Sequence, residues 1–166
     1  EAGLEDGFTA SLKLPPPIYA RRTGELIASQ LGKIGIKVEI KALAQANVIA
    51  AGGEADQAPM IWSGGMAWIA DFPDPSNFYA PILGCAGAVD GGWNWSWYCN
   101  EALDDTAAKA DAMVKPEQQA ERIKLWEGIY TDIMADAPWV PVFNEQRFTI
   151  RSSRMGGHDN IYVDPV

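Results

Sequence analysis

Apolar and polar residues alternate at period two over 8–14 and again over 37–43, a pattern typical of β-strands with one buried face. Three prolines at 15–17 end the first run, because proline has no N–H to donate to a neighbouring strand. Residues 19–34 predict a helix, and the stripe at its three-to-four spacing comprises Leu26, Ile27, Gln30, Leu31 and Ile34. A strand, a helix and a strand in this order form a βαβ unit, so we expect the two strands to be parallel.

The rest of the chain predicts further helices and strands on either side of a long loop. Helices are expected over 45–51, 101–113 and 116–135, and strands over 59–63, 139–143, 147–151 and 161–163. The buried stripe expected of the last helix comprises Ile123, Trp126, Ile129, Tyr130, Ile133 and Met134. Asn100 is a suitable N-cap for the helix that follows it. Residues 64–98 show no period, which indicates a long structured loop with one helical turn near 76–79. The fold class is therefore α/β in a single domain.

Composition and charge exclude some classes of binding partner. The 166 residues are 48% hydrophobic and 21% charged, as in a globular domain, and carry a net charge of −9. Lys and Arg do not cluster beyond Arg21 and Arg22, so nucleic acid is not an expected partner. No apolar run approaches the length that spans a bilayer.

Two cysteines, Cys85 and Cys99, bracket a loop rich in Gly and Trp. They lack the CxxC spacing of a zinc site, and the only histidine, His158, lies far away in sequence. We therefore expect a disulfide, which would stabilise the fold by roughly 3 kcal/mol through loop closure and would imply an oxidising compartment. The alternative is a pair of unrelated buried thiols.

Asp71 is the residue whose position is most informative. It follows an apolar stretch at 60–70 and precedes a turn containing Pro73 and Pro75, where a chain leaves a core and a side chain can face a cleft. A buried carboxylate is costly unless it is paired, which favours a cation from the protein or from a ligand as its partner. The alternative is that Asp71 is an Asx-turn residue or a helix cap.

Signatures of catalysis are not found in the sequence. Its Gly pairs match no phosphate-binding loop, and no GxSxG elbow accompanies His158. Two carboxylate pairs occur: Asp104 and Asp105 fall in the first turn of a predicted helix, where they complement the helix dipole, whereas Asp71 and Asp74 lack a defined separation for acid–base work. We predict no catalytic residue, no metal ligand and no cofactor.

The tryptophans Trp93, Trp95 and Trp97 would share one side if their stretch were extended. Exposed rings there would form a surface on which a ligand such as a sugar could stack. Alternatively, most of them fold inward beneath the disulfide as a small satellite core, with one reaching a cleft.

Five phrases, in this order along the chain, resemble the extracytoplasmic solute-binding proteins of peptide-type ABC transporters, the family of dipeptide- and oligopeptide-binding proteins. The phrases are Glu1–Phe8, Ile27–Ile40, Trp68–Phe78, Asn94–Asn100 and Asp136–Val142. The resemblance implies that residues 1–166 are the C-terminal lobe of a longer two-lobed protein, with the periplasmic-binding-protein fold of type II and a mixed sheet flanked by helices. The missing N-terminal lobe would carry the signal peptide and the other wall of the cleft.

The resemblance also implies a site. The residue that matches Asp71 binds the α-ammonium group of a peptide in relatives, and the stretch matching Gly65, Met66, Ala67, Trp68 and Ile69 lies along the peptide and offers backbone hydrogen bonds. It further implies a periplasmic or extracytoplasmic location, attached to the membrane through the permease subunits of the transporter, which agrees with the Cys85–Cys99 disulfide.

The expected function is therefore the capture of a di- or oligopeptide for import. The fold does not fix the ligand, because other branches of the family bind non-peptide solutes. An oligosaccharide or another non-peptide solute is the alternative ligand. A third possibility is that the acidic surface serves mainly to dock on transporter subunits.

Overall fold

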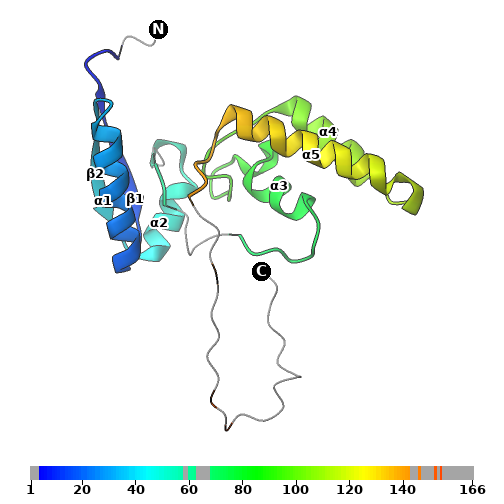
Figure 1. Cartoon of the computed structure of the whole chain (residues 1–166), viewed down its shortest axis with the longest axis horizontal. Coiled ribbons are helices and arrows are strands. Elements are labelled where there is room, and N and C mark those ends of the chain that lie inside the picture. Colours follow the sequence, from blue (N-terminus) through cyan, green and yellow to red (C-terminus); the bar gives the residue numbers. More distant parts are fainter. Residues whose placement is uncertain are drawn as a thin grey trace.

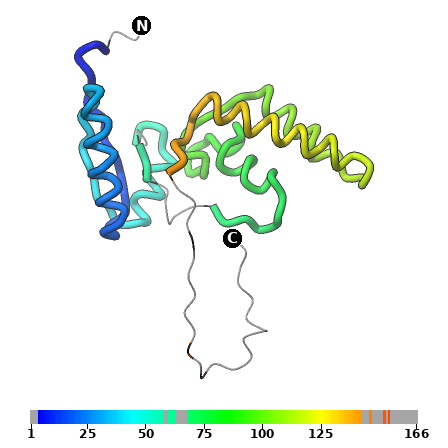
Figure 2. Tube along the Cα trace, viewed as in Figure 1, coloured from blue at the N-terminus to red at the C-terminus, as the bar shows by residue number. Residues whose placement is uncertain are grey.

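The computed structural model describes residues 4–57, 60–62 and 68–142, together with residues 146, 152 and 154. Figure 1 shows a strand–helix–strand unit on one side, the helices α3, α4 and α5 on the other, and α2 between them. The chain winds through these units in sequence order, as the colours in Figure 2 show. Three short 3₁₀ helices complete the described elements: η1 (Ala55–Gln57), η2 (Cys85–Gly87) and η3 (Pro116–Gln118). The predicted α/β class is confirmed.

The first unit is a βαβ unit, as predicted. Strands β1 (Phe8–Leu14) and β2 (Ile36–Ala42) pair in parallel along their whole length, and α1 (Ile18–Gly32) crosses between them. The helix ends two residues earlier than expected, because residues 33–35 form a turn in which Gly35 has a φ of 86°. Glycine adopts this left-handed conformation without the steric cost that a side chain adds. Within the described residues the sheet is parallel, so the mixed sheet remains a prediction.

The face of α1 that packs on the sheet matches the predicted stripe only in part, through Ile27, which packs against the core. Leu26 and Ile34 are exposed, whereas Ala20 and Gly24 are buried beside β1. A Cβ atom at Gly24 would lie 2.5 Å from Cδ2 of Leu14, so the missing side chain lets helix and strand approach closely. Small residues contribute little to a hydrophobic pattern, so the sequence did not show that Ala20 and Gly24 share the packing face with Ile27.

The predicted third strand is reduced to a single bridge next to β1. In residues 60–62, Ile61 pairs in parallel with Lys13; the N–H of Lys13 donates to the carbonyl of Met60 (3.0 Å), and the N–H of Trp62 donates to the carbonyl of Lys13 (2.9 Å). Residues 59 and 63 lie outside the described residues. The Lys13 side chain is buried, and its Nζ donates to the carbonyl and to Oε1 of Gln57.

The second unit consists of α3 (Ser76–Ile82), α4 (Glu101–Asp111) and α5 (Gln119–Asp136), which share one hydrophobic core. The helical turn expected near 76–79 is the start of α3. In α5 the expected stripe is only partly buried: Trp126, Ile129 and Ile133 lie in the core, whereas Ile123 and Met134 are exposed. Residues 139–142 do not form the strand predicted over 139–143. Residue 143 and the strands predicted over 147–151 and 161–163 lie outside the described residues.

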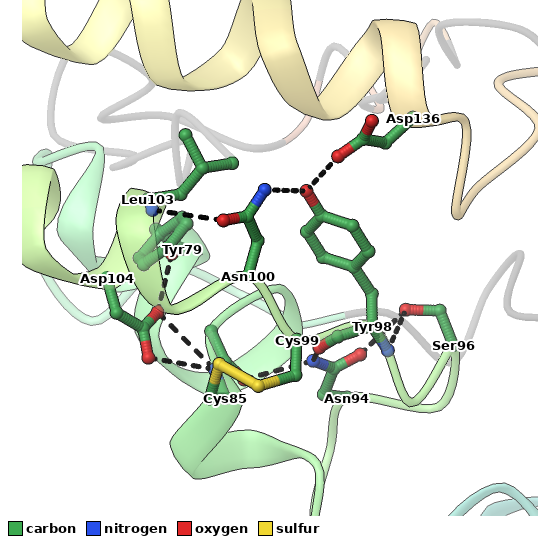
Figure 3. Close-up of a disulfide and its surroundings, with 11 residues drawn as sticks. Tyr79, Cys85, Asn94, Ser96, Tyr98, Cys99, Asn100, Leu103, Asp104 and Asp136 are labelled. Atoms are coloured by element: carbon green, nitrogen blue, oxygen red, sulfur yellow. Dashed lines mark hydrogen bonds between the residues drawn. A yellow bond between two sulfur atoms is a disulfide. The ribbon is translucent and has the colours of Figure 1, made fainter.

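The disulfide between Cys85 and Cys99 is present, with their Cα atoms 4.4 Å apart, and it closes the Trp-rich loop as predicted (Figure 3). Inside the loop, Nδ2 of the buried Asn94 donates to the carbonyls of Gly84 (3.0 Å) and Tyr98 (2.7 Å). Asp104 accepts hydrogen bonds from the Tyr79 hydroxyl and from the N–H of Cys85, which confirms its structural role in the first turn of α4. The loop is thereby fixed to the second unit.

Figure 3 also shows the start of α4. Asn100 caps the helix, as predicted, by accepting a hydrogen bond from the N–H of Leu103. The Tyr98 hydroxyl donates to Asp136, which ties the loop to the last residue of α5. Burial and this bond to Asp136 raise the pKa of Tyr98 above its ordinary value, so the hydroxyl stays protonated and continues to donate at neutral pH.

Helix α2 (Gln45–Gly52) joins the two units. Its Val48 is fully buried and clusters with Trp95 of the disulfide loop. The carbonyl of Gly53 accepts from the N–H of Gly91 (2.9 Å), and the carbonyl of Gly52 accepts from Nε1 of Trp97 (3.3 Å). A Cβ atom at Gly52 would lie 2.5 Å from the Trp95 ring, so this joint requires glycine.

We expect Gly52→Ala to lower the free energy of unfolding by about 1–3 kcal/mol, because the methyl group would force Trp95 out of its packed position. Gly128→Ala in α5 is the matched control: a Cβ atom there has open space around it, and alanine in a helix interior stabilises by about 0.5–1 kcal/mol. Urea unfolding of the three proteins measures both effects. A Gly52→Ala protein as stable as the unaltered chain would show that the joint is not tightly packed.

Candidate ligand-binding site

The candidate site is built on residues 68–75, which lead into α3. Two prolines in this segment, Pro73 and Pro75, cannot donate backbone hydrogen bonds, which disfavours both a helix and a paired strand through it. Residues 71–74 bend, and α3 starts directly after Pro75, whose carbonyl accepts from the N–H of Tyr79 (3.0 Å). The Tyr130 hydroxyl of α5 also donates to this carbonyl (2.9 Å) and fixes the end of the segment to the helical unit. Burial, together with the nearby Asp74 charge, raises the pKa of Tyr130 to about 12.

Asn77 fixes the other end of the segment, and sequence reasoning missed it. It is only 7% exposed, and its Oδ1 accepts hydrogen bonds both from Nε1 of Trp68 (3.1 Å) and from the backbone N–H of Asp71 (2.9 Å). One buried amide oxygen therefore sets the orientation of the Trp68 ring and of the Asp71 backbone together. The only signal for it in the sequence is its position inside the Trp68–Phe78 phrase.

Asp71 itself is exposed, which corrects the expectation of a buried carboxylate. Within the part of the chain that the structure describes, its carboxylate has neither a hydrogen bond nor an ion pair. It also does not cap α3 or close the turn. The alternative role considered for Asp71, a turn or cap residue, belongs instead to Asp74, whose Oδ1 accepts from the N–H (3.0 Å) and the hydroxyl (2.8 Å) of Ser76.

Asp74 is held by Arg122 of α5. Nη2 of Arg122 lies 2.8 Å and 2.7 Å from the two carboxylate oxygens, and its Nε donates to the carbonyl of Ala110 (3.1 Å). Partial burial acts to raise the pKa of Asp74, but the bonds from Arg122 and Ser76 outweigh it and keep this pKa below its ordinary value. Asp74 is therefore a structural carboxylate, and it does not form a free acid–base pair with Asp71.

The tryptophan stretch is not extended, because residues 93–97 turn back on themselves: the N–H of Trp95 donates to the carbonyl of Trp93, and the N–H of Trp97 donates to that of Asn94. Trp95 is buried, and Trp93 stacks on it with ring centroids 5.6 Å apart. Trp93 remains 40% exposed and meets Trp68 edge to face at 6.0 Å. This arrangement matches the prediction that most of the cluster folds inward while one ring reaches a cleft.

A hollow of about 500 Å³ lies beside this segment. Its lining includes Trp68, Phe72, Asn77, Pro81, Gly92 and Trp93. Of the predicted contact residues, Trp68 is half-buried at the rim of this hollow and Ile69 is exposed next to it. Gly65, Met66 and Ala67 lie outside the described residues, so their predicted role stays a prediction.

The described part of the chain contains no group of three acidic, His or Cys side chains arranged to hold a metal ion. None of its helices combines the length and the hydropathy that crossing a membrane requires.

Comparison with known proteins gives consistent matches. Residues 1–90 match the family described as bacterial extracellular solute-binding proteins, family 5 Middle. Di/tripeptide-binding protein 4 of Pseudomonas aeruginosa is 29% identical over 87% of this chain and 25% of its own length, and heme-binding protein A of Haemophilus influenzae is 29% identical over 95% of this chain and 28% of its own length.

Among solved structures, the periplasmic binding protein DppA of Helicobacter pylori in complex with the peptide STSA superposes with a TM-score of 0.72 at 29% identity. The superposition covers 84% of this chain and 26% of that protein. The chain thus spans about a quarter of the length of the relatives it matches. Because the family match covers more than half of its residues, the chain belongs to family 5 of the bacterial extracellular solute-binding proteins.

Proposed function

We propose that this chain forms one wall of the ligand cleft in a two-lobed protein that captures a di- or oligopeptide for an ABC importer. The family consists of solute-binding proteins and not of enzymes. In this proposal the chain is the C-terminal lobe, and an N-terminal lobe supplies the opposite wall. The chain covers about a quarter of the length of its relatives, which fits a chain that is one part of a longer protein.

The observation that carries the proposal is the Asp71 carboxylate, which is exposed and unpaired within the described residues while its backbone is held by Asn77. In open solvent such a carboxylate is hydrated at no cost. When a second lobe closes over it, water is removed and the negative charge requires a cation. The α-ammonium group of a peptide supplies that cation through a charge-assisted hydrogen bond.

The backbone beside Asp71 adds a second means of recognition. Within the described residues, the N–H and carbonyl groups of residues 68–70 form no hydrogen bonds with other backbone groups. An extended peptide can pair with such a free stretch as an added strand, so that main-chain bonds give affinity for any sequence. A ligand whose free N-terminus binds Asp71 and whose main chain pairs with residues 68–70 is a peptide.

Partners and location follow from the proposal. Closure around the ligand is a hinge motion between the lobes, and the closed form would deliver the peptide to the permease subunits at the outer face of the membrane. The family description, extracellular, and the Cys85–Cys99 disulfide both support an extracytoplasmic location.

A non-peptide solute is the second candidate. The exposed Trp93 ring beside Trp68 favours it, since flat rings stack on sugars, and one relative is named as a heme-binding protein. Thermal unfolding of the full-length protein with oligosaccharides, heme and peptides separates the candidates, because a ligand that binds only the native state raises the melting temperature.

One prediction of this proposal concerns the ammonium contact. In the full-length protein, Asp71→Asn should weaken the binding of a tripeptide such as Ala-Ala-Ala by roughly 10- to 100-fold, the loss expected when a charged hydrogen bond is removed. Isothermal titration calorimetry measures this. N-acetyl-Ala-Ala-Ala, which lacks the ammonium, should bind the unaltered protein weakly and lose little further in the variant.

Asp90→Asn is the matched control, because Asp90 is an exposed carboxylate of the disulfide loop outside the site, and it should leave peptide affinity unchanged. Equal binding of Ala-Ala-Ala by the Asp71→Asn variant and the unaltered protein would refute the ammonium contact. A protein that ignores peptides altogether would refute peptide capture.

A further prediction of this proposal concerns Asn77. Replacing it with leucine keeps the branched shape of the side chain but removes the acceptor shared by Trp68 and Asp71, which leaves the segment free to move. We expect peptide affinity to fall by roughly 5- to 50-fold through lost preorganisation. Asn77→Asp keeps an acceptor oxygen and should retain much of the affinity. If the leucine variant folds and binds as well as the unaltered protein, Asn77 does not position the site.

A further inference from the structure

We propose that one face of helix α5 holds the Asp71 carboxylate in position for the ammonium group of the ligand. This face, the α5 row, consists of Arg122, Trp126 and Tyr130, which lie four residues apart and therefore line up along one side of the helix. They act through the segment before α3 and not by contact with the ligand, so they are positioning residues. The inference rests on the proposed function and adds to it the residues that set the geometry of the ammonium contact.

The α5 row holds the segment at two consecutive residues, Asp74 and Pro75. Nη2 of Arg122 lies 2.8 Å and 2.7 Å from the two carboxylate oxygens of Asp74. Further along α5, the Tyr130 hydroxyl donates to the carbonyl of Pro75 (2.9 Å). The backbone that leads from Asp71 into α3 is thereby attached to a single helix that lies outside the segment.

Trp126 connects the two side chains that hold the segment. It is only 3% exposed, and Cζ of Arg122 lies 5.9 Å from the centroid of its ring, a cation–π contact that restricts the guanidinium group. The Tyr130 ring lies 6.2 Å from the Trp126 ring, and Tyr79 of α3 meets that ring edge to face at 5.8 Å. The α5 row is therefore packed as one unit against the helix that the segment enters.

Hydrogen bonds connect Asp74 to Asp71 through the start of α3. Oδ1 of Asp74 accepts from the N–H (3.0 Å) and the hydroxyl (2.8 Å) of Ser76, the first residue of α3. The next residue, Asn77, accepts at Oδ1 from the N–H of Asp71 (2.9 Å). A displacement of Asp74 therefore moves the start of α3, and with it the amide oxygen that holds the Asp71 backbone.

The charge of Arg122 is what keeps Asp74 in place. The side chains of Asp74 and Arg122 are 26% and 14% exposed, so both charges have limited access to water. Without the guanidinium group, Asp74 would be a partly buried carboxylate lacking its cation, and the turn would open to hydrate it. Opening of the turn would carry Asp71 away from the position in which its carboxylate meets an ammonium group.

The test measures the ammonium contact by itself. Calorimetry on the full-length protein gives the dissociation constants of N-acetyl-Ala-Ala-Ala and Ala-Ala-Ala, and their ratio reports the gain from the free ammonium group. Arg122→Gln should lower this ratio by roughly 3- to 10-fold, because a displaced carboxylate no longer forms the charged hydrogen bond. Arg122→Lys keeps a cation for Asp74 and should retain most of the ratio. Tyr130→Phe, which removes only a hydroxyl group, should lower it by roughly 2- to 3-fold.

Two further measurements separate positioning from general stability. Arg21→Gln removes an exposed ion pair with Glu25 on α1 and is the matched control, which should leave the ratio unchanged. Hydrogen exchange of the full-length protein, read by mass spectrometry over residues 68–78, should be faster in Arg122→Gln than in the control, because the bond from the Asp71 N–H to Asn77 opens more often.

Each result supports or overturns the inference. If Arg122→Gln is folded and keeps the ratio, or if both peptides lose affinity by the same factor, the α5 row only stabilises the fold and does not position Asp71. If Arg122→Gln does not fold, Tyr130→Phe decides by the same criterion. A ratio of one in the unaltered protein would instead refute the ammonium contact of the proposed function, and the absence of binding of either peptide would refute peptide capture.

Discussion

The packing of Trp95 against Gly52 is the contact on which the arrangement of this chain depends. It joins the βαβ unit to the helical unit through α2, and it leaves no room for a side chain at position 52. From Trp95 a continuous series of contacts reaches the candidate site: Trp93 stacks on Trp95, Trp68 meets Trp93, and Asn77 holds both Trp68 and the backbone of Asp71. The position of an exposed carboxylate is thus set by a buried ring at the joint between the two units.

The disulfide makes this series of contacts rigid. A loop rich in glycine would otherwise sample many conformations, and ordering it would oppose ligand binding through lost entropy. The Cys85–Cys99 bond, the buried amide of Asn94 and the carboxylate of Asp104 remove much of that freedom in the folded chain. The same covalent bond ties the fold to an oxidising compartment, so the chemistry that stabilises the site also limits where it can work.

Local features of the sequence predicted local features of the fold. Alternation at period two located β1 and β2 to within one residue, and the order of strand, helix and strand gave their parallel pairing. The N-cap role of Asn100 and the disulfide were predicted as well. The first depends only on neighbouring residues, and the second followed because the two cysteines lack the spacing of a zinc site. Features that depend on contacts between distant residues could not be predicted from the sequence. Gly24 makes the packing face of α1 only because Leu14 lies opposite, and the Trp-rich stretch turns because Asn94 bonds to residues on either side of it.

The two carboxylates of the site show why a pattern alone does not assign a role. Asp71 and Asp74 lie three positions apart beside the same prolines, yet α5 supplies Arg122 to Asp74 and supplies no cation to Asp71 within the described residues. The pairing of Asp74 with Arg122 holds the turn rigid. Asp71 has no such partner within the described residues, so the water around its charge must be replaced when the cleft closes. In our proposal that difference makes closure selective. Without an ammonium group in place, the closed form would bury an uncompensated charge, and the open form is then favoured.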